Sequence, residues 1–210
     1  SRGSSGGEDV FIAKLSSNGG WLWAKAAGGT GNDQGRDVQI DSVGNVIVGG
    51  MFTGTAFFGT LSRTSSGAED LFVANLSGSG GWNWVVTAGG SDEDQLFALA
   101  LGPAGGIQVT GWYFDDITFG SHTLQIGGVA DMFVGKLSHS GSWTSAVRAG
   151  GTGGAGYIFG YSIEIDGSGN TYVTAIYYDT VHFDSITKNG GGLTGSGYIL
   201  WDMVVAKLSS

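Results

Sequence analysis

The side chains best suited to binding are acidic and aromatic residues in predicted surface loops. Carboxylates supply the oxygen ligands that calcium takes, and Tyr and Trp rings combine an apolar face for stacking on sugars with a polar tip. Both kinds of residue gather after predicted strands, where loops on a rigid scaffold commonly carry function. The candidate ligand-binding residues are Trp112, Tyr113, Asp115, Asp116, Tyr157, Tyr177, Tyr178 and Asp179.

The acidic residues do not form a recognised calcium loop. Asp33, Asp92, Glu93 and Asp94 also fall in predicted loops, but the sequence contains no Asp-x-Asp-x-Asp-Gly run. We therefore predict no metal site and no cofactor, and interpret these acids as solubilising charges. A chelator is then expected to change the melting temperature little, because an occupied site would add stability by mass action.

Catalytic groups are sparse. The three histidines fall at different places in the chain, and none has a second His or a Cys at metal-ligand spacing. The glycine-rich run around Gly78-Ser79-Gly80 lacks the strand-turn-helix context of a nucleophile elbow. We expect no enzymatic activity. The alternative is a carbohydrate-active enzyme, which would need loop carboxylates such as Asp94 and Asp116 to face one cleft within about 10 Å of each other.

A recurring heptapeptide must position these loops. The run Asp9-Val-Phe-Ile-Ala-Lys-Leu15 returns three times, at spacings of 61, 61 and 71 residues. A near-constant period of this length is typical of repeat architectures, and residues that recur with it are expected to be structural. The further copies start at Asp70, Asp131 and Asp202, and the recurring partners are Trp21, Trp82 and Trp143 and the pairs Gly28-Gly29, Gly89-Gly90 and Gly150-Gly151.

Each repeat predicts four short strands, which in the first copy cover residues 10–15, 21–26, 37–41 and 46–50. Apolar residues alternate between turns rich in Gly and Ser, and helical spacing is absent. Because the heptapeptide is apolar on both faces, it should lie between two layers, with Phe72 and Phe133 fully buried. Asp41 and Asp166 are expected to cap their own hairpins. Longer connections, predicted as loops, cover 52–69, 113–130 and 177–201.

Four antiparallel strands in about 60 residues are typical of a propeller blade. The predicted fold is therefore all-β: a β-propeller-like repeat array of four-stranded antiparallel blades, with about three repeats of 61–71 residues. Residues 1–7 read as a Gly/Ser-rich lead, and residues 8–210 as a single repeat domain or a segment of a larger propeller. Repeats start near residues 9, 70 and 131, with a partial copy at 202–208.

Composition excludes several classes of partner. A formal net charge of −9 would repel a phosphate backbone, so nucleic acid is not expected as a partner. No apolar run approaches the roughly 18 residues of a membrane helix, so membrane insertion is not expected.

The sequence has no Cys, which removes disulfides and thiolate zinc sites. Glycine accounts for 42 of 210 residues, which fits many tight turns between short strands.

The order of motifs resembles the β-propeller repeats of the SBBP type, which occur mainly in bacterial and archaeal exported or surface proteins. The resemblance rests on Gly-x-Asp-x-Phe-x-Ala-Lys-Leu, then Gly and Trp, then Gly-Gly, then Asp-x-x-Gly-Asn-Val, and covers residues 7–208. It implies a propeller fold, an extracellular or cell-surface location, and a scaffold without a shared catalytic set. Departures occur at Gly102, Gly106, Ser145 and Val204.

The phase of the repeats predicts two open ends. Residues 10–26 match the third and fourth strands of a blade, whereas the last blade stops at its third strand, near residue 208. Unpaired strand edges invite pairing with another chain. We therefore expect protein partners or self-association, or coverage by further blades. A compact arrangement in which residues 10–26 complete the last blade is a third possibility.

The expected function is a structural or adhesive binding module, and the alternative is a glycan-binding propeller that uses loop aromatics.

Overall fold

The computed structural model describes residues 6–191 and 200–209, and every secondary-structure element in these ranges is a β-strand. Residues 1–5 of the predicted lead and residues 192–199 of the last predicted connection lie outside the described residues, as does Ser210. Among the described residues, no helix is long and apolar enough to span a bilayer.

Nineteen strands make up the described fold. They are β1 (Val10–Leu15), β2 (Trp21–Gly29), β3 (Asp33–Ile40), β4 (Val46–Phe52), β5 (Thr55–Phe58), β6 (Leu61–Thr64), β7 (Asp70–Leu76), β8 (Trp82–Ala88), β9 (Asp94–Leu101), β10 (Ile107–Tyr113), β11 (Ile117–Phe119), β12 (His122–Leu124), β13 (Asp131–Leu137), β14 (Trp143–Ala149), β15 (Tyr157–Ile165), β16 (Thr171–Tyr178), β17 (Thr180–Phe183), β18 (Ile186–Asn189) and β19 (Asp202–Leu208).

The main sheets follow the predicted repeats. The second sheet has the order β3-β4-β7-β8 and the third the order β9-β10-β13-β14, and all their neighbouring strands are antiparallel. The last sheet contains β15-β16-β19, without a fourth strand among the described residues, as the phase predicts. The first sheet begins with β1-β2. The predicted all-β fold of repeated four-stranded antiparallel sheets is confirmed.

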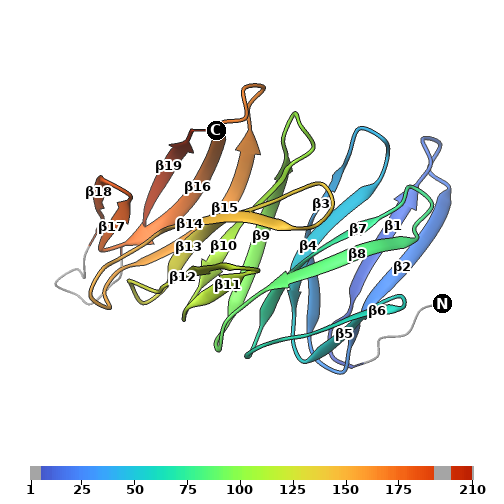
Figure 1. The fold of residues 1–210 in the computed structure, drawn as a ribbon, viewed down its shortest axis with the longest axis horizontal. Helices are drawn as coiled ribbons and strands as arrows, with labels where there is room; N and C mark the ends of the chain where they lie inside the picture. Colours follow the sequence, from blue (N-terminus) through green and yellow to red (C-terminus); the bar gives the residue numbers. More distant parts are fainter. Residues whose placement is uncertain (1–5, 192–199, 210) are drawn as a thin grey trace.

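The sheets stand in an open row rather than a ring, with the first and last sheets at opposite ends (Figure 1). Strand β1 pairs with β2, and β2 also pairs with β5, whereas neither β1 nor β2 pairs with the last sheet. The compact arrangement in which they complete the last blade is therefore not adopted.

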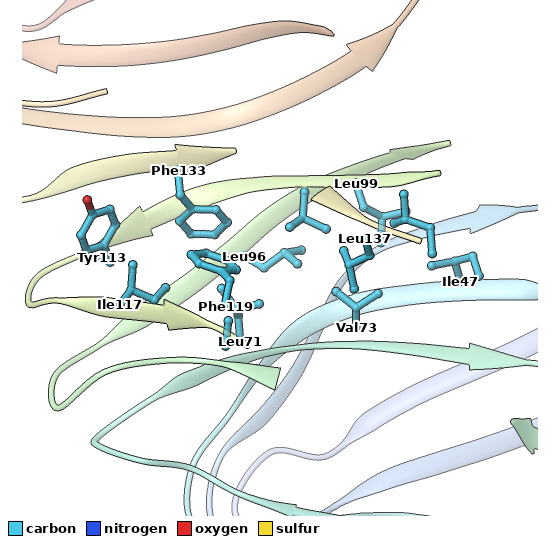
Figure 2. Close-up of a cluster of buried hydrophobic side chains, with 13 residues drawn as sticks. Ile47, Leu71, Val73, Leu96, Leu99, Tyr113, Ile117, Phe119, Phe133 and Leu137 are labelled. Carbon is cyan, nitrogen blue, oxygen red and sulfur yellow. The ribbon is translucent and has the colours of Figure 1, made fainter. Parts of the chain in front are cut away.

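The core lies between consecutive sheets, because each sheet is apolar on the faces that meet its neighbours. Ile47, Leu71 and Val73 of the second sheet pack against Leu96 and Leu99 of the third (Figure 2). Burying each such side chain stabilises the fold by about 1.5 to 3 kcal/mol relative to leaving it exposed. The predicted burial of Phe72 and Phe133 is confirmed, since both are fully buried.

The connections predicted as loops contain β-hairpins, so that part of the prediction is wrong. The hairpin β5-β6 lies between β4 and β7 in the chain but hydrogen-bonds to β2, in the preceding sheet. The hairpins β11-β12 and β17-β18 reach back in the same way, through bridges from Gly89 to Thr118 and from Gly150 to His182. Each hairpin therefore ties one repeat to the sheet before it.

A recurring phenylalanine anchors two of these hairpins. Phe58 lies 4.9 Å from Phe72 and 5.4 Å from Trp82, measured between ring centroids. Phe119 occupies the equivalent place, 5.1 Å from Phe133 and 4.9 Å from Trp143. Edge-on and tilted ring contacts at these distances are favourable. The residue after each phenylalanine is a glycine with positive φ, which allows the tight reversal.

The predicted hairpin caps are confirmed. Asp166 Oδ1 accepts hydrogen bonds from the backbone N–H groups of Ser168 and Asn170, both at 2.9 Å, and Asp41 makes the equivalent bonds in the first full repeat. The side chain of Asn170 donates to Asp166 Oδ2 at 2.8 Å, and this bond lowers the pKa of Asp166 more than any other contact. These aspartates therefore serve their own turns.

Candidate functional site

The first sheet borders a groove of about 550 Å³ at the N-terminal end of the row. One wall is the free edge of β1, including Phe11 and Leu15, and the other is formed by β3 and β4, including Arg36, Val38 and Ile40. The groove is thus lined by apolar side chains, and the guanidinium of Arg36 adds a positive charge. If the first sheet were built like the second, a strand pair equivalent to β3-β4 would lie beside β1 and fill the groove.

The residues that line the groove are buried wherever a neighbouring strand pair exists. Phe11 is 64% exposed, whereas its counterparts Phe72 and Phe133 are fully buried. Leu15 and Val38 are also about half exposed. Their counterparts are buried: Leu76 and Leu137 for Leu15, and Leu99 and Ile163 for Val38. The N-terminal end therefore exposes positions that the repeat normally covers.

The opposite end of the row shows the same pattern. Met203 is 76% exposed and Val205 is 65% exposed. Their strand partners on β16 place them at the positions of Leu71 and Val73, which are fully buried against the third sheet. Together with the free outer edge of β19, these side chains form the C-terminal face.

Aromatic rings form a continuous row on the last two sheets. Trp112 lies 5.3 Å from Phe159, which lies 5.5 Å from Trp201. Tyr157 and Tyr178 lie 6.1 Å apart, and each is within 6.2 Å of Trp201. We call these five residues the aromatic row. It brings together three of the predicted ligand-binding residues, Trp112, Tyr157 and Tyr178, and adds Phe159 and Trp201.

The other predicted ligand-binding residues lie elsewhere. Tyr113 and Tyr177 are buried in the core, so their rings are not available to a ligand. Asp115 bonds the Ser91 hydroxyl, and Asp116 accepts the backbone N–H of Ile126 at 2.8 Å. Asp179 has a positive φ and accepts the N–H of Thr180 at 2.8 Å. The three acids therefore serve turns and loop contacts.

Two acids assigned to surface loops start strands instead. Asp33 is the first residue of β3 and Asp94 is the first residue of β9, and both are about 1% exposed. Asp33 Oδ2 accepts the N–H of Gly29 at 2.7 Å, and Asp94 Oδ2 accepts the N–H of Gly90 at 2.6 Å. The enzyme alternative required Asp94 and Asp116 to face one cleft, whereas Asp94 is buried and Asp116 is exposed.

Asp33 and Asp94 occupy equivalent places, and Ile158 occupies the third; we call these places junctions 1, 2 and 3. At each one, a backbone N–H at the start of one sheet donates to the backbone carbonyl of the residue before the recurring aspartate of the preceding sheet. The bonds run from Asp33 to Glu8 at 2.7 Å, from Asp94 to Glu69 at 2.7 Å, and from Ile158 to Ala130 at 3.0 Å. Junction 1 thus holds Asp9 and Asp33, junction 2 holds Asp70 and Asp94, and junction 3 holds Asp131 and Ile158.

Junction 2 concentrates negative charge in a buried place. Burial raises the pKa of Asp94 to about 8, with further contributions from the carboxylates of Asp70, Asp92 and Asp115. Burial also raises the pKa of Asp70. At junction 1, burial raises the pKa of Asp33, and the nearby Asp9 adds to this effect.

Junction 3 is neutralised by the chain itself. Arg148 Nη1 lies 2.5 Å from Asp131 Oδ2, and Asp131 also accepts the backbone N–H groups of Gly127, Gly128 and Gly151. Within residues 6–191 and 200–209, no group of three or more His, Cys, Asp or Glu side chains is placed to hold a metal ion.

The fold defines a class: an all-β repeat protein built as an open row of antiparallel sheets. No family model matches the chain. A stretch of 127 residues is 32% identical to the regulatory protein FlaEY of Caulobacter vibrioides, and the match covers 59% of this chain and 13% of FlaEY. The chain therefore resembles a small part of a much longer protein, and its resemblance to SBBP repeats stays a prediction.

Proposed function

We propose that the chain is a non-enzymatic structural module of an exported or cell-surface protein, and that it binds further sheets of its own repeat type at both ends of the row. The observation that carries this proposal is the exposure of Phe11, Met203 and Val205 at positions that are buried between sheets elsewhere in the same molecule. The placement outside the cell rests on the resemblance to SBBP repeats.

The two ends are complementary in kind. Inside the molecule, the face that contains Leu71 and Val73 packs against the inner strand of the next sheet, which contains Leu99. On the C-terminal face, Met203 and Val205 are the counterparts of Leu71 and Val73. In the groove, Val38 is the counterpart of Leu99. For the isolated chain, a second copy is therefore the partner that fits, in a head-to-tail contact.

The first prediction is that this association depends on one intact end from each partner. Phe11→Glu in the groove and Met203→Glu on the C-terminal face should each abolish concentration-dependent association in analytical ultracentrifugation. Both side chains are largely exposed, so a charge should leave the fold intact while opposing docking. An equal mixture of the two variants should form dimers that grow no further, because each pair then retains one intact head-to-tail contact.

Val147→Glu is a matched control. Val147 is an exposed apolar residue on β14, away from both ends, and Lys25 occupies the equivalent position in the first repeat. This variant should associate like the wild type. A wild-type chain that stays monomeric at high concentration would contradict the proposal, and so would equal effects of the three variants.

The aromatic row supports glycan binding as a second candidate function. Its rings are partly exposed and lie next to one another in tilted and edge-on contacts, and exposed ring faces can stack on sugar rings. Trp201→Ala should then weaken binding of oligosaccharides in a glycan array or by calorimetry, whereas Trp21→Ala, an exposed tryptophan outside the row, should not. Absence of binding by the wild type would remove this candidate.

A further inference from the structure

The groove at the N-terminal end follows the outer edge of β1. In the second and third sheets, the strand at this place pairs on both sides, β7 with β4 and β8, and β13 with β10 and β14. Among the described residues, β1 pairs only with β2. We propose that the groove is a strand-addition site, which takes the second strand of a further repeat sheet, with Val-Thr-Gly at its centre, antiparallel to β1. This inference rests on the proposed function, because it names the strand through which a further sheet binds at this end.

The site is continuous with the boundary between the first two sheets. Val10 and Ile12 of β1 are buried in one apolar cluster with Val46 and Val48 of β4. The groove runs along residues 11–15 of β1 and has the same two valines of β4 in its wall. A strand beside β1 would therefore extend a sheet and a core that already exist.

The first constraint on the added strand comes from Phe11. Residues that face each other at this position are balanced in size in every sheet that has both strands. The facing pairs are Phe72 with Gly50, Phe133 with Gly111, and Val204 with Ala175. A Cβ on Gly50 would lie 2.9 Å from Phe72 Cε1, which is too close for a side chain. Because Phe11 is as large as its counterparts Phe72 and Phe133, it requires a glycine opposite.

The second constraint comes from Gly35, on the opposite wall of the groove. At the next boundary, a Cβ on Gly49 would lie 2.9 Å from Leu96 Cδ2. At the last boundary the sizes are reversed, and a Cβ on Gly160 would lie 2.5 Å from Thr110 Oγ1. Leu96 and Gly160 are the counterparts of Gly35. Since interiors are closely packed, a glycine on this wall calls for threonine on the added strand, as it does in the last pair.

Threonine also finds a hydrogen-bond acceptor at this place. The Thr110 hydroxyl donates to the backbone carbonyl of Phe133 at 2.8 Å, and Thr110 is fully buried. Phe11 is the counterpart of Phe133, so its carbonyl is the equivalent acceptor on β1. A buried hydroxyl needs such a partner.

The third constraint comes from Ala13. Its counterparts each face a valine, and these valines are at most 3% exposed. The facing pairs are Ala74 with Val48, Gly135 with Val109, and Ala206 with Val173. The strand that faces Ala13, Ile12 and Phe11 therefore reads Val-Thr-Gly. Strand β10 carries this sequence, whereas β4 carries Val-Gly-Gly and β16 carries Val-Thr-Ala at the same place.

The test measures, by fluorescence anisotropy, the binding of a synthetic peptide with the sequence of residues 94–113, the β9-β10 hairpin. The receptor is the full chain with Met203→Glu, which alters the face through which a second copy would compete for the groove. We expect the peptide to bind and to protect backbone amides of β1 from hydrogen exchange. In the peptide, Gly111→Leu and Thr110→Gly should each weaken binding by about tenfold or more, through overpacking and through a cavity respectively.

Gly35→Leu in the chain provides a matched exchange, because Leu96 occupies this position in the next repeat. It should reverse the preference, so that the peptide with Thr110→Gly binds more tightly than the unchanged peptide. Val147→Glu in the chain, away from the groove, should leave binding of both peptides unchanged.

A peptide that does not bind, or that binds equally with and without Gly111→Leu, would overturn the inference. If circular dichroism shows that the Gly35→Leu chain fails to fold, the peptide series decides alone. Peptide binding without self-association of the wild-type chain would contradict the head-to-tail contact and leave the strand-addition site standing. Self-association without peptide binding would do the reverse.

Discussion

Replacing Phe72 with Ala is expected to lower the free energy of unfolding by about 3 to 5 kcal/mol, whereas the same change at Phe11 is expected to cost little. Phe72 is fully buried, 4.9 Å from Phe58 and 6.4 Å from Phe52 between ring centroids, so truncation leaves a cavity. Phe11 occupies the same place in its repeat but is 64% exposed. Phe133→Ala should resemble Phe72→Ala.

Urea unfolding at low protein concentration would measure these differences, because dilution removes any stability contributed by association. Equal denaturant midpoints for the Phe11 and Phe72 variants would show that the strand register is assigned wrongly. A loss at Phe11 that appears only at high concentration would instead report its burial in an assembly.

Raising the pH from about 5 to about 9 in the presence of a chelator is expected to destabilise the protein, with Asp94 as the main cause. Its pKa is about 8 in the folded protein, against about 3.9 for an unfolded aspartate. The folded state therefore holds the proton more tightly, and stability that is fully present below the unfolded pKa is lost as the pH rises through about 8. The raised pKa values of Asp33 and Asp70 act in the same direction.

Asp94→Asn is expected to flatten this dependence, because an amide keeps an acceptor for the Gly90 N–H and cannot ionise. The difference between pH 5 and pH 9 should be on the order of a few kcal/mol in the wild type, since each unit of pKa shift corresponds to about 1.4 kcal/mol. Asp92→Asn provides the control at an exposed position. An unchanged pH profile in the Asp94 variant would show that Asp94 is ionised at neutral pH in the folded protein.

Much of the architecture is encoded in local pattern. Alternating apolar residues and the period of the heptapeptide predict the strands of the second and third sheets, and the two-sided character of Asp70–Leu76 predicts the burial of Phe72. The hairpins β5-β6 and β11-β12 were missed because their strands have only three or four residues. A signal for them exists: Phe58-Gly59 and Phe119-Gly120 recur at the period of the repeat.

The candidate sites could be predicted only in part. The aromatic row includes Trp112 and Tyr178, which the sequence singles out, but whether a ring faces solvent depends on strand register, and Tyr113 and Tyr177 turn inward. Asp94 lies in a polar, glycine-rich segment that reads as a loop. Its burial depends on the contact with Glu69 in the preceding sheet, which no local pattern reveals.

The hairpins that reach back to the preceding sheet connect each pair of neighbouring sheets by backbone hydrogen bonds. Strands β5 and β6 lie between β4 and β7 of the second sheet in sequence but belong to the first sheet by hydrogen bonding, so neither sheet can unfold without disturbing the other. In repeat proteins, strong coupling between nearest neighbours makes the whole array melt together. Separating two neighbouring sheets would therefore break backbone hydrogen bonds as well as contacts between packed faces.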